Sequence, residues 1–148
     1  MISLASFEDW REIQILERKC YREIDVFKSH QLKHLLRSKT CVSLVYRNSK
    51  MAIVANVIGL LRYFKIPSGR IYNIAVSPDF QKMGIGSELI KKIENFFVKS
   101  GMLKSCAEVR VSNLASSAMF IKSGYFPLKT LFNYYPDGED GIKLWKTL

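Results

Sequence analysis

The sequence has few residues that cross-link the chain or bind metals. Its 148 residues include three cysteines, four prolines and two histidines. Cys20, Cys41 and Cys106 are odd in number and lack C-x-x-C spacing, so we expect buried free thiols and no disulfide framework. His30 and His34 are four residues apart on an expected helix. Two histidines without a third ligand make a poor zinc site, so we expect no bound metal.

Long apolar runs are also absent. The first ten residues lack a basic region followed by an apolar stretch, so no signal peptide is expected. The longest apolar stretch, residues 51–61, is interrupted by Asn56 and Gly59 and is too short to span a bilayer. No internal repeat, low-complexity tract or linker divides the chain. We therefore expect one domain over residues 1–148, soluble and cytoplasmic, without membrane contact.

Acidic residues are few, 13 against 23 lysines and arginines, which gives a net charge of +10. The positive charge is spread over residues 11–39 and 82–104. Such an excess favours anionic partners, for example a CoA phosphate, an acidic protein or ribosomal RNA. Solubility explains most of the lysines more simply. Because no helix–turn–helix or RNA-binding motif accompanies the charge, we expect no specific nucleic-acid partner and ribosome docking at most.

The pattern of apolar residues predicts strands that alternate with helices. Helices are expected from Ser6 or Asp9 onward and over residues 28–37, 84–99 and 114–122. Strands are expected over residues 1–4, 41–46, 51–64, 70–76, 105–112, 124–133 and 142–146. Hairpins followed by strand–helix–strand–helix–strand indicate an α/β or α+β domain around a mixed sheet.

One segment has the form of an anion site. The strand that ends at Val76 is followed by a loop with Gly84 and Gly86, and then by a helix. Helix N-termini bind anions through unpaired amides, and glycines allow the backbone to come close. Ser87-Glu88 after the second glycine excludes a Walker loop, and the missing third glycine argues against a dinucleotide fold. The alternative is a simple helix cap, and the loop alone does not decide between them.

Three segments in this order resemble the GNAT superfamily of acetyltransferases. The first is Val76-Ser77-Pro78-Asp79-Phe80-Gln81 followed by Gly84-Ile85-Gly86. The second is residues 108–113 with Ala115, Ala118, Phe120 and residues 124–126. The third, Asn133-Tyr134-Tyr135-Pro136-Asp137-Gly138-Glu139-Asp140, resembles the ribosomal-protein alanine N-acetyltransferases and related protein N-terminal acetyltransferases. The likeness covers about half of the chain, from Ile71 onward.

The resemblance implies a GNAT-like domain with a mixed, mostly antiparallel sheet of about six or seven strands, flanked by about four helices. It implies acetyl-CoA as the cofactor and CoA as the product. The backbone of Ile74, Ala75 and Val76 is expected to pair with the pantetheine arm. Further cofactor contacts are expected at Gln81, Lys82, Met83, Gly84, Ile85, Gly86 and Ser87 around the pyrophosphate, and at Asn113 and Phe120.

Glu108 matches the proton acceptor of this family. The strand pattern supports a special position for it, because Val109 and Val111 face one way while Glu108 and Arg110 face the other. A polar face on a central strand indicates a cleft, although a solvent-exposed Glu–Arg pair is the alternative. We expect Glu108 to be the catalytic base and Arg110 to bind substrate.

Phe120 departs from the family pattern, which usually has a tyrosine there as the acid for the departing CoA thiolate. A thiol has an ordinary pKa of about 8.5, so its anion is a tolerable leaving group. General acid help is worth about 10²–10⁴-fold, and we expect a slower enzyme or a substitute donor. Tyr134 and Tyr135 are candidates, and their motif suits substrate binding at least as well. We assign Tyr134 to catalysis and Tyr135 to substrate binding.

These residues predict direct acetyl transfer from acetyl-CoA to a primary amine, in particular the N-terminal α-amine of a ribosomal protein or nascent chain. A rival is transfer to lysine side chains or a small amine, since Asp137, Glu139 and Asp140 could attract a cation. A second rival is an acetyl-CoA-binding protein with little turnover, which Phe120 favours. The expected partner is a protein or peptide N-terminus, near the ribosome, and the expected state is a monomer or homodimer.

Overall fold

A single open sheet of seven strands organises the chain in the computed structural model, which describes residues 1–148. The strands are β1 (Ile2–Leu4), β2 (Cys41–Arg47), β3 (Ile53–Arg62), β4 (Ser68–Val76), β5 (Lys104–Arg110), β6 (Phe126–Leu131) and β7 (Gly141–Thr147). Their order in the sheet is β1-β2-β3-β4-β5-β7-β6. Only β4 and β5 pair in parallel, and every other neighbouring pair is antiparallel. The expected mixed, mostly antiparallel sheet is confirmed.

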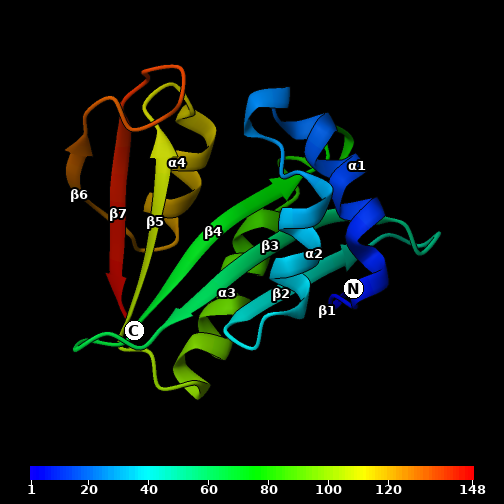
Figure 1. The fold of residues 1–148 in the computed structure, drawn as a ribbon, viewed down its shortest axis with the longest axis horizontal. Coiled ribbons are helices and arrows are strands. Elements are labelled where there is room, and N and C mark those ends of the chain that lie inside the picture. Colours follow the sequence, from blue (N-terminus) through cyan, green and yellow to red (C-terminus); the bar gives the residue numbers. More distant parts are fainter.

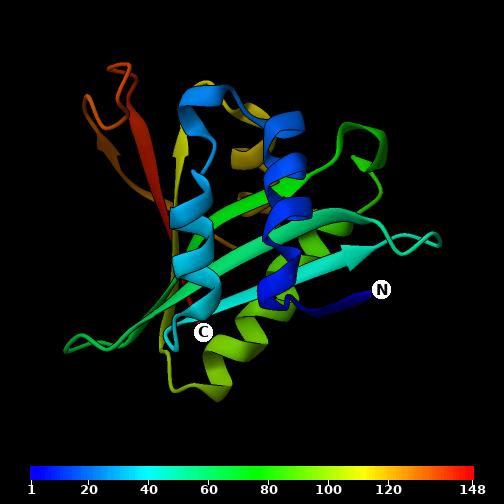
Figure 2. The same cartoon turned by 45° about the vertical axis from the view of Figure 1, so that its right-hand side comes forward.

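Four α-helices flank this sheet. They are α1 (Trp10–Cys20), α2 (Ser29–Arg37), α3 (Ile85–Lys99) and α4 (Leu114–Lys122), and short 3₁₀ turns span Phe7–Asp9, Glu23–Asp25 and Pro78–Phe80. As Figure 2 shows, α1 and α2 lie on one face of β2–β4 and α3 lies on the other. None of the helices is both long enough and apolar enough to cross a membrane.

The helix predictions agree with the structure to within a few residues, while several strands are shorter than expected. The strand expected over residues 51–64 begins at Ile53, because Met51 has a φ of 65° and belongs to the turn. The strand expected over residues 124–133 begins at Phe126, because Gly124 has a φ of 94°. The first helix begins as a 3₁₀ turn at Phe7 before α1. Turn geometry therefore accounts for these differences.

The larger core lies between the sheet and α3. Leu89, Ile90, Ile93 and Phe97 of α3 are fully buried at helical spacing. A smaller core under α1 and α2 includes Ile13, Leu16 and Leu32 on the helices and Val45 and Ile58 on the strands. Both faces of β2–β4 are therefore covered, which holds the centre of the sheet rigidly.

The parallel pair β4–β5 is short. It includes only the partners Ser68–Ile71 on β4 and Lys104–Ala107 on β5. Beyond this point β4 stays paired with β3 as far as Val76, while β5 stays paired with β7 as far as Arg110. Figure 1 shows the two strands spreading apart from a common base, with β5, β7 and β6 on one side of the opening.

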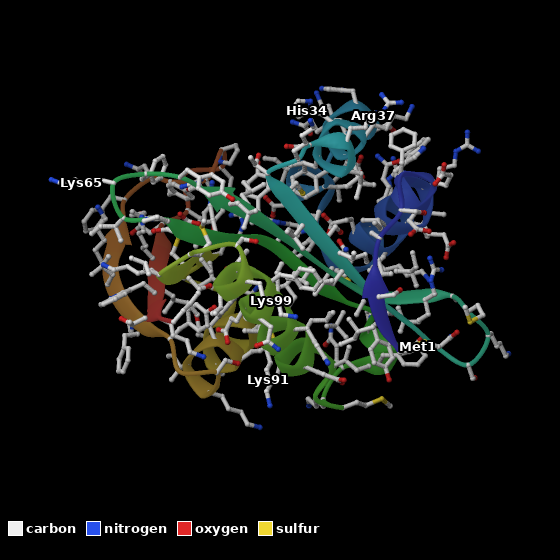
Figure 3. All side chains as sticks on the ribbon, turned by 90° about the horizontal axis from the view of Figure 1, so that it is seen from below. Met1, His34, Arg37, Lys65, Lys91 and Lys99 are labelled. Atoms are coloured by element: carbon white, nitrogen blue, oxygen red, sulfur yellow. The ribbon has the colours of Figure 1, made fainter.

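Cations lie on several sides of the molecule. In Figure 3, Lys91 and Lys99 project from α3, Arg37 lies on α2 on the opposite side, and Lys65 lies at the turn between β3 and β4. The positive charge expected from the sequence is therefore distributed over several elements.

Two glycines make room for the Phe97 ring in the core. A Cβ atom on Gly69 would lie 2.3 Å from the Phe97 ring, and one on Gly59 would lie 2.7 Å from it. We expect Gly69→Ala to lower the free energy of unfolding by about 1–3 kcal/mol, because the ring cannot move without disturbing its packed neighbours. Urea unfolding measures this change.

A double variant separates overpacking from a backbone effect. Phe97→Leu leaves space above residue 69, so Gly69→Ala should cost much less in that background than in the parent chain. Equal costs in the two backgrounds would contradict the contact with the ring as the cause.

Candidate functional site

The spreading of β4 and β5 leaves backbone groups of β4 without a strand partner. The carbonyl of Ile74 accepts a hydrogen bond from the Tyr21 hydroxyl. The carbonyl of Val76 accepts from Gln81 Nε2 at 3.0 Å and from Cys20 Sγ at 3.3 Å. Because strand residues alternate in direction, the N–H groups of Ile74 and Val76 point to the same side as these carbonyls. An extended ligand can therefore pair with this edge once those side chains release the two carbonyl groups.

A cavity of about 580 Å³ lies along this edge. That volume is within the usual range for a cofactor site. Its lining comes from the end of α1, from β4, from the loop before α3, and from α4: Cys20, Tyr21, Ile74, Ala75, Val76, Phe80, Gln81, Lys82, Gly84, Ile85, Gly86, Ser87, Asn113, Ala115, Ser116, Ala118, Met119 and Lys122. The elements expected to bind a phosphate-bearing cofactor thus surround one cavity.

The loop before α3 has the geometry of an anion cradle. Lys82 and Gly84 have φ angles of 62° and 79°, and Gly84 caps α3 without any side chain bonding to the first-turn amides. Those amides are free to bind an anion, and the helix dipole favours negative charge there. A Cβ on Gly86 would lie 2.5 Å from Met119 Sδ, so a larger residue there would require the Met119 side chain to move.

A second cavity, about 240 Å³, adjoins the first from the side of β5. Glu108, Arg110, Tyr135 and Phe120 are among the residues that line it. Four residues line both cavities and mark their junction: Tyr21, Ile74, Asn113 and Ser116. The two cavities therefore place a cofactor-sized space and a smaller space next to each other, with two hydroxyl groups where they meet.

Glu108 is held by an arginine that the sequence did not single out. Arg70 Nε lies 2.9 Å from Glu108 Oε2, and Arg70 also donates to the Tyr134 hydroxyl at 3.2 Å. Both charged side chains are largely buried. Burial lowers the pKa of Arg70, while the Glu108 carboxylate, with Tyr134 and Tyr72, raises it, and the net shift is upward. The second oxygen of Glu108, Oε1, has no hydrogen-bond partner within the protein and is free to receive a proton from a ligand.

Arg110 is already occupied by three carboxylates. It forms ion pairs with Asp25 at 2.7 Å, with Asp137 at 2.9 Å and with Glu139 at 2.7 Å, and its guanidinium lies over the Tyr135 ring. Hydrogen bonds from Arg110 hold the pKa of Asp137 well below its usual range. These contacts connect the α1–α2 segment to the loop between β6 and β7. Substrate binding by Arg110 stays a prediction, and the contacts point to a role in holding two loops together.

The expected site residues fall into three groups. Most of the residues expected at the cofactor line the larger cavity: Ile74, Ala75, Val76, Gln81, Lys82, Gly84, Ile85, Gly86, Ser87 and Asn113. Met83 lines neither cavity and is exposed, and Phe120 is buried against Tyr125 and lines the smaller cavity instead. Tyr134 lines neither cavity, although its contact with Arg70 keeps it near Glu108. The roles of these residues remain predictions.

Cys20 lies in the larger cavity, but its environment does not suit a nucleophile. Burial is the main cause that raises the pKa of its thiol to about 11, and the nearby Glu17 carboxylate adds to the effect. The reactive form of cysteine is the thiolate, so at neutral pH Cys20 is protonated and unreactive. All three cysteines are free thiols, as expected, but they are partly and not fully buried.

Glu17 is a second carboxylate near the junction, and it is almost completely buried. Its Oε1 accepts a hydrogen bond from Asn73, its Oε2 has no partner, and only 1% of the residue is exposed. Burial raises the pKa of Glu17 to about 7; the Asn73 hydrogen bond opposes this shift and the Asp25 charge adds to it. A buried carboxyl without full hydrogen bonding favours its neutral form.

This shift makes stability depend on pH. Because the pKa of Glu17 rises from 4.5 to about 7 on folding, the folded state holds the proton more tightly. The resulting stabilisation is complete below about pH 4.5 and is lost as the pH rises toward 7. We expect Glu17→Gln to be about 3 kcal/mol more stable, relative to the parent chain, at pH 8 than at pH 4.5. Urea unfolding of both proteins across this range measures the difference, and a difference that stays constant with pH would contradict a neutral Glu17.

Comparisons with known proteins agree with this architecture. Residues 7–125 match the family model described as the acetyltransferase (GNAT) family. An uncharacterized N-acetyltransferase of Methanocaldococcus jannaschii is 36% identical over 83 residues, which are 53% of this chain and 51% of that protein. The ribosomal protein bS18-alanine N-acetyltransferase of Escherichia coli K12 is 34% identical over 99 residues, which are 65% of this chain and 64% of that protein. The matched regions therefore span between half and two thirds of these relatives.

Solved structures share the whole fold. Ard1 from Thermoplasma volcanium superposes with a TM-score of 0.88 at 23% identity, and the match covers 100% of this chain and 97% of that one. At this identity the likeness establishes the fold, and the chemistry must be argued from the residues of the site.

Proposed function

The chain belongs to the acetyltransferase (GNAT) family, and we propose that it transfers an acetyl group from acetyl-CoA to a primary amine, the N-terminal α-amine of a protein. The observation that carries this proposal is the junction of the two cavities. The unpaired edge of β4 and the anion cradle before α3 line one cavity, and Glu108 lines the other. A donor and an acceptor can meet there.

The residues of the larger cavity fit acetyl-CoA. The edge at Ile74 and Val76 would pair with the amides of the pantetheine arm, and the amides from Lys82 to Ser87 would hold the pyrophosphate. The free first-turn amides of α3 support this fit, because no side chain caps them. Bound acetyl-CoA supplies a thioester whose carbonyl carbon is open to attack by an amine. The N–H groups near Val76 would polarise that carbonyl, as an oxyanion site does.

Glu108 is the proposed proton acceptor. Arg70 binds Oε2 of Glu108 and so fixes the orientation of the carboxylate. The other oxygen, Oε1, is free to take a proton from the incoming ammonium, directly or through a water molecule. An α-ammonium has an ordinary pKa of about 7.7–8.0, against about 10.4 for lysine, so a modest base suffices for a protein N-terminus. Because Cys20 holds its proton, direct transfer is favoured over an acyl-enzyme.

The acceptor proposal rests on the relatives. The second cavity, about 240 Å³, is large enough to hold the first residue of a peptide. The E. coli relative is named as an alanine N-acetyltransferase for a ribosomal protein. The rival idea of a cation-attracting acidic cluster loses support, because Asp137 and Glu139 are paired with arginines and Asp140 accepts from the Asn133 amide.

A peptide panel tests the activity. With acetyl-CoA present, we expect CoA release with peptides that begin with alanine or serine, and much less with N-terminally blocked lysine peptides or with spermidine. We expect Glu108→Gln to lower kcat by about 10²–10³-fold, because the amide cannot accept the proton. Glu8→Gln is the matched control, since Glu8 is exposed and makes no ion pair.

Calorimetry with CoA shows whether the Glu108→Gln variant still binds the cofactor. Equal rates for Glu108→Gln and the parent chain at every pH would remove the base assignment and leave the transferase proposal standing. Tight CoA binding without acetylation of any amine in the panel would favour an acetyl-CoA-binding protein instead.

The proton for the departing thiolate needs a source other than Phe120, whose ring has none to give. Tyr21 and Ser116 carry the hydroxyl groups at the junction of the cavities. Burial, with the Glu17 charge, raises the pKa of Tyr21, so its phenol stays protonated at neutral pH and is a weaker acid than the CoA thiol. We propose that the Tyr21 hydroxyl, released from the Ile74 carbonyl when the pantetheine occupies the β4 edge, donates a hydrogen bond to the departing thiolate, and that the thiolate takes its proton from solvent.

The Tyr21→Phe variant isolates this hydroxyl. We expect kcat to fall by about 10²-fold while the affinity for CoA changes little, because the ring and its packing remain. Ser116→Ala is the comparison, since it removes the other hydroxyl at the junction. A full loss of rate in Ser116→Ala, with none in Tyr21→Phe, would transfer the role to the serine.

A further inference from the structure

One face of the β5–β7–β6 half of the sheet carries no helix. Ala107 and Val109 of β5 are buried in the core formed with α3, and Lys146 of β7 bonds to Glu94 on α3. Because strand residues alternate, Glu108 and Lys143 lie on the opposite face. Figure 1 views this open face: α1 and α2 lie in front of β2–β4, and no helix lies in front of β5, β7 and β6.

On this face, three charged residues form one row across the strands. Glu108 of β5 is directly opposite Lys143 of β7, and Lys143 is directly opposite Lys129 of β6. We call Lys143 and Lys129 the lysine row. It begins next to the proposed base and runs to the edge strand of the sheet.

Neither lysine of the row forms an ion pair in the protein. Glu108 is directly opposite Lys143, but its carboxylate pairs with Arg70. Like charges directly opposite each other on neighbouring strands destabilise a sheet. The row therefore has an electrostatic cost that a bound anion would relieve.

More positive charge lies close to the row. Burial and the Glu108 charge raise the pKa of the Cys106 thiol, and the cations that act against this are Lys143, Arg62 and Arg70. Aromatic side chains border the same face: Phe126 is directly opposite Trp145, and Lys104 lies over the Trp145 ring. The open face is thus basic and aromatic.

The residue spacing of an extended peptide is comparable with the distances from Glu108 to the two lysines. Neighbouring strands lie about 4.8 Å apart, so Lys143 and Lys129 are displaced from Glu108 by about 5 and 10 Å along the row. An extended peptide advances about 3.3 Å per residue. If the acceptor amine is at Glu108, its second to fourth residues pass over the two lysines.

We infer that the lysine row selects acceptor proteins that carry Asp or Glu at the second to fourth residues. This inference rests on the proposed function and adds the acceptor class: a small first residue followed by acidic residues. Exposed carboxylate–lysine contacts are individually weak, and two of them change affinity by up to about tenfold. The selection is electrostatic, so salt weakens it.

A peptide series tests the inference. All peptides begin with alanine and differ only at residues 2–4, which carry Asp and Glu, Asn and Gln, or Lys. We expect kcat/KM to fall in that order, by about tenfold from acidic to neutral at low salt, and the spread to shrink in 0.5 M salt, where the screening length is only about 4–5 Å. Parent and variant chains are assayed with the same acetyl-CoA concentration.

Charge reversal identifies the surface responsible. Lys143→Glu combined with Lys129→Glu should invert the order, so that the Lys peptide becomes the better acceptor. Lys91→Glu combined with Lys99→Glu is the matched control on α3, away from the open face, and should keep the parent order (Figure 3).

The possible failures are distinct. Acetylation of all three peptides at equal rates, or an unchanged order in the Lys143/Lys129 variant, would overturn the selection while the proposed function stands. In that case Lys129 serves only to keep the edge strand from pairing with other chains. If no peptide is acetylated, both the proposed function and the inference fail.

Discussion

The separation of β4 from β5 after four paired residues is the constraint on which the rest of the site depends. Each strand continues with its other neighbour, so the opening costs no rigidity on either side. It does expose backbone groups of β4, and buried backbone groups need partners. Tyr21, Cys20 and Gln81 supply them from α1 and from the loop before α3. The site is therefore a gap in a sheet. Side chains form hydrogen bonds with the exposed carbonyl groups of β4, and a ligand can replace these side chains.

Charged groups hold the walls of this gap in place. Arg70 fixes Glu108 on one wall, and Arg110 joins Asp25 near the end of α1 to Asp137 and Glu139 in the loop between β6 and β7. Arginine suits both tasks because its planar group can bind carboxylates in a fixed geometry. The sequence suggests that this acidic loop could attract a cation, but its carboxylates Asp137 and Glu139 are paired with arginines of the protein.

Local patterns in the sequence predicted much of this architecture. The apolar spacing of residues 84–99 identified α3, and the glycines at 84 and 86 indicated a tight loop before it, because both depend on neighbouring residues. Alternation in β5 separated Glu108 from Val109 for the same reason. Tyr21, Arg70 and Glu17 carried no such signal. Their importance comes from contacts with residues 38 to 56 positions away in the chain, and only the pairing of β4 with β5 and the packing of α1 bring these partners together.

The cations of the chain differ in whether they form ion pairs within the fold. Seven carboxylates form ion pairs, and the partners are Arg18, Arg22, Arg47, Arg70, Arg110 and Lys146. Five of these six cations are arginines, so the ion pairs of the structure rely mainly on arginine, and most of its lysines form no ion pair. On α3 such lysines face water and aid solubility. Lys143 and Lys129 are different, because they are opposite each other on two neighbouring strands of the open face, beside Glu108, and neither forms an ion pair. The composition shows only the total charge, while the register of β5, β7 and β6 shows which part of it a partner would meet.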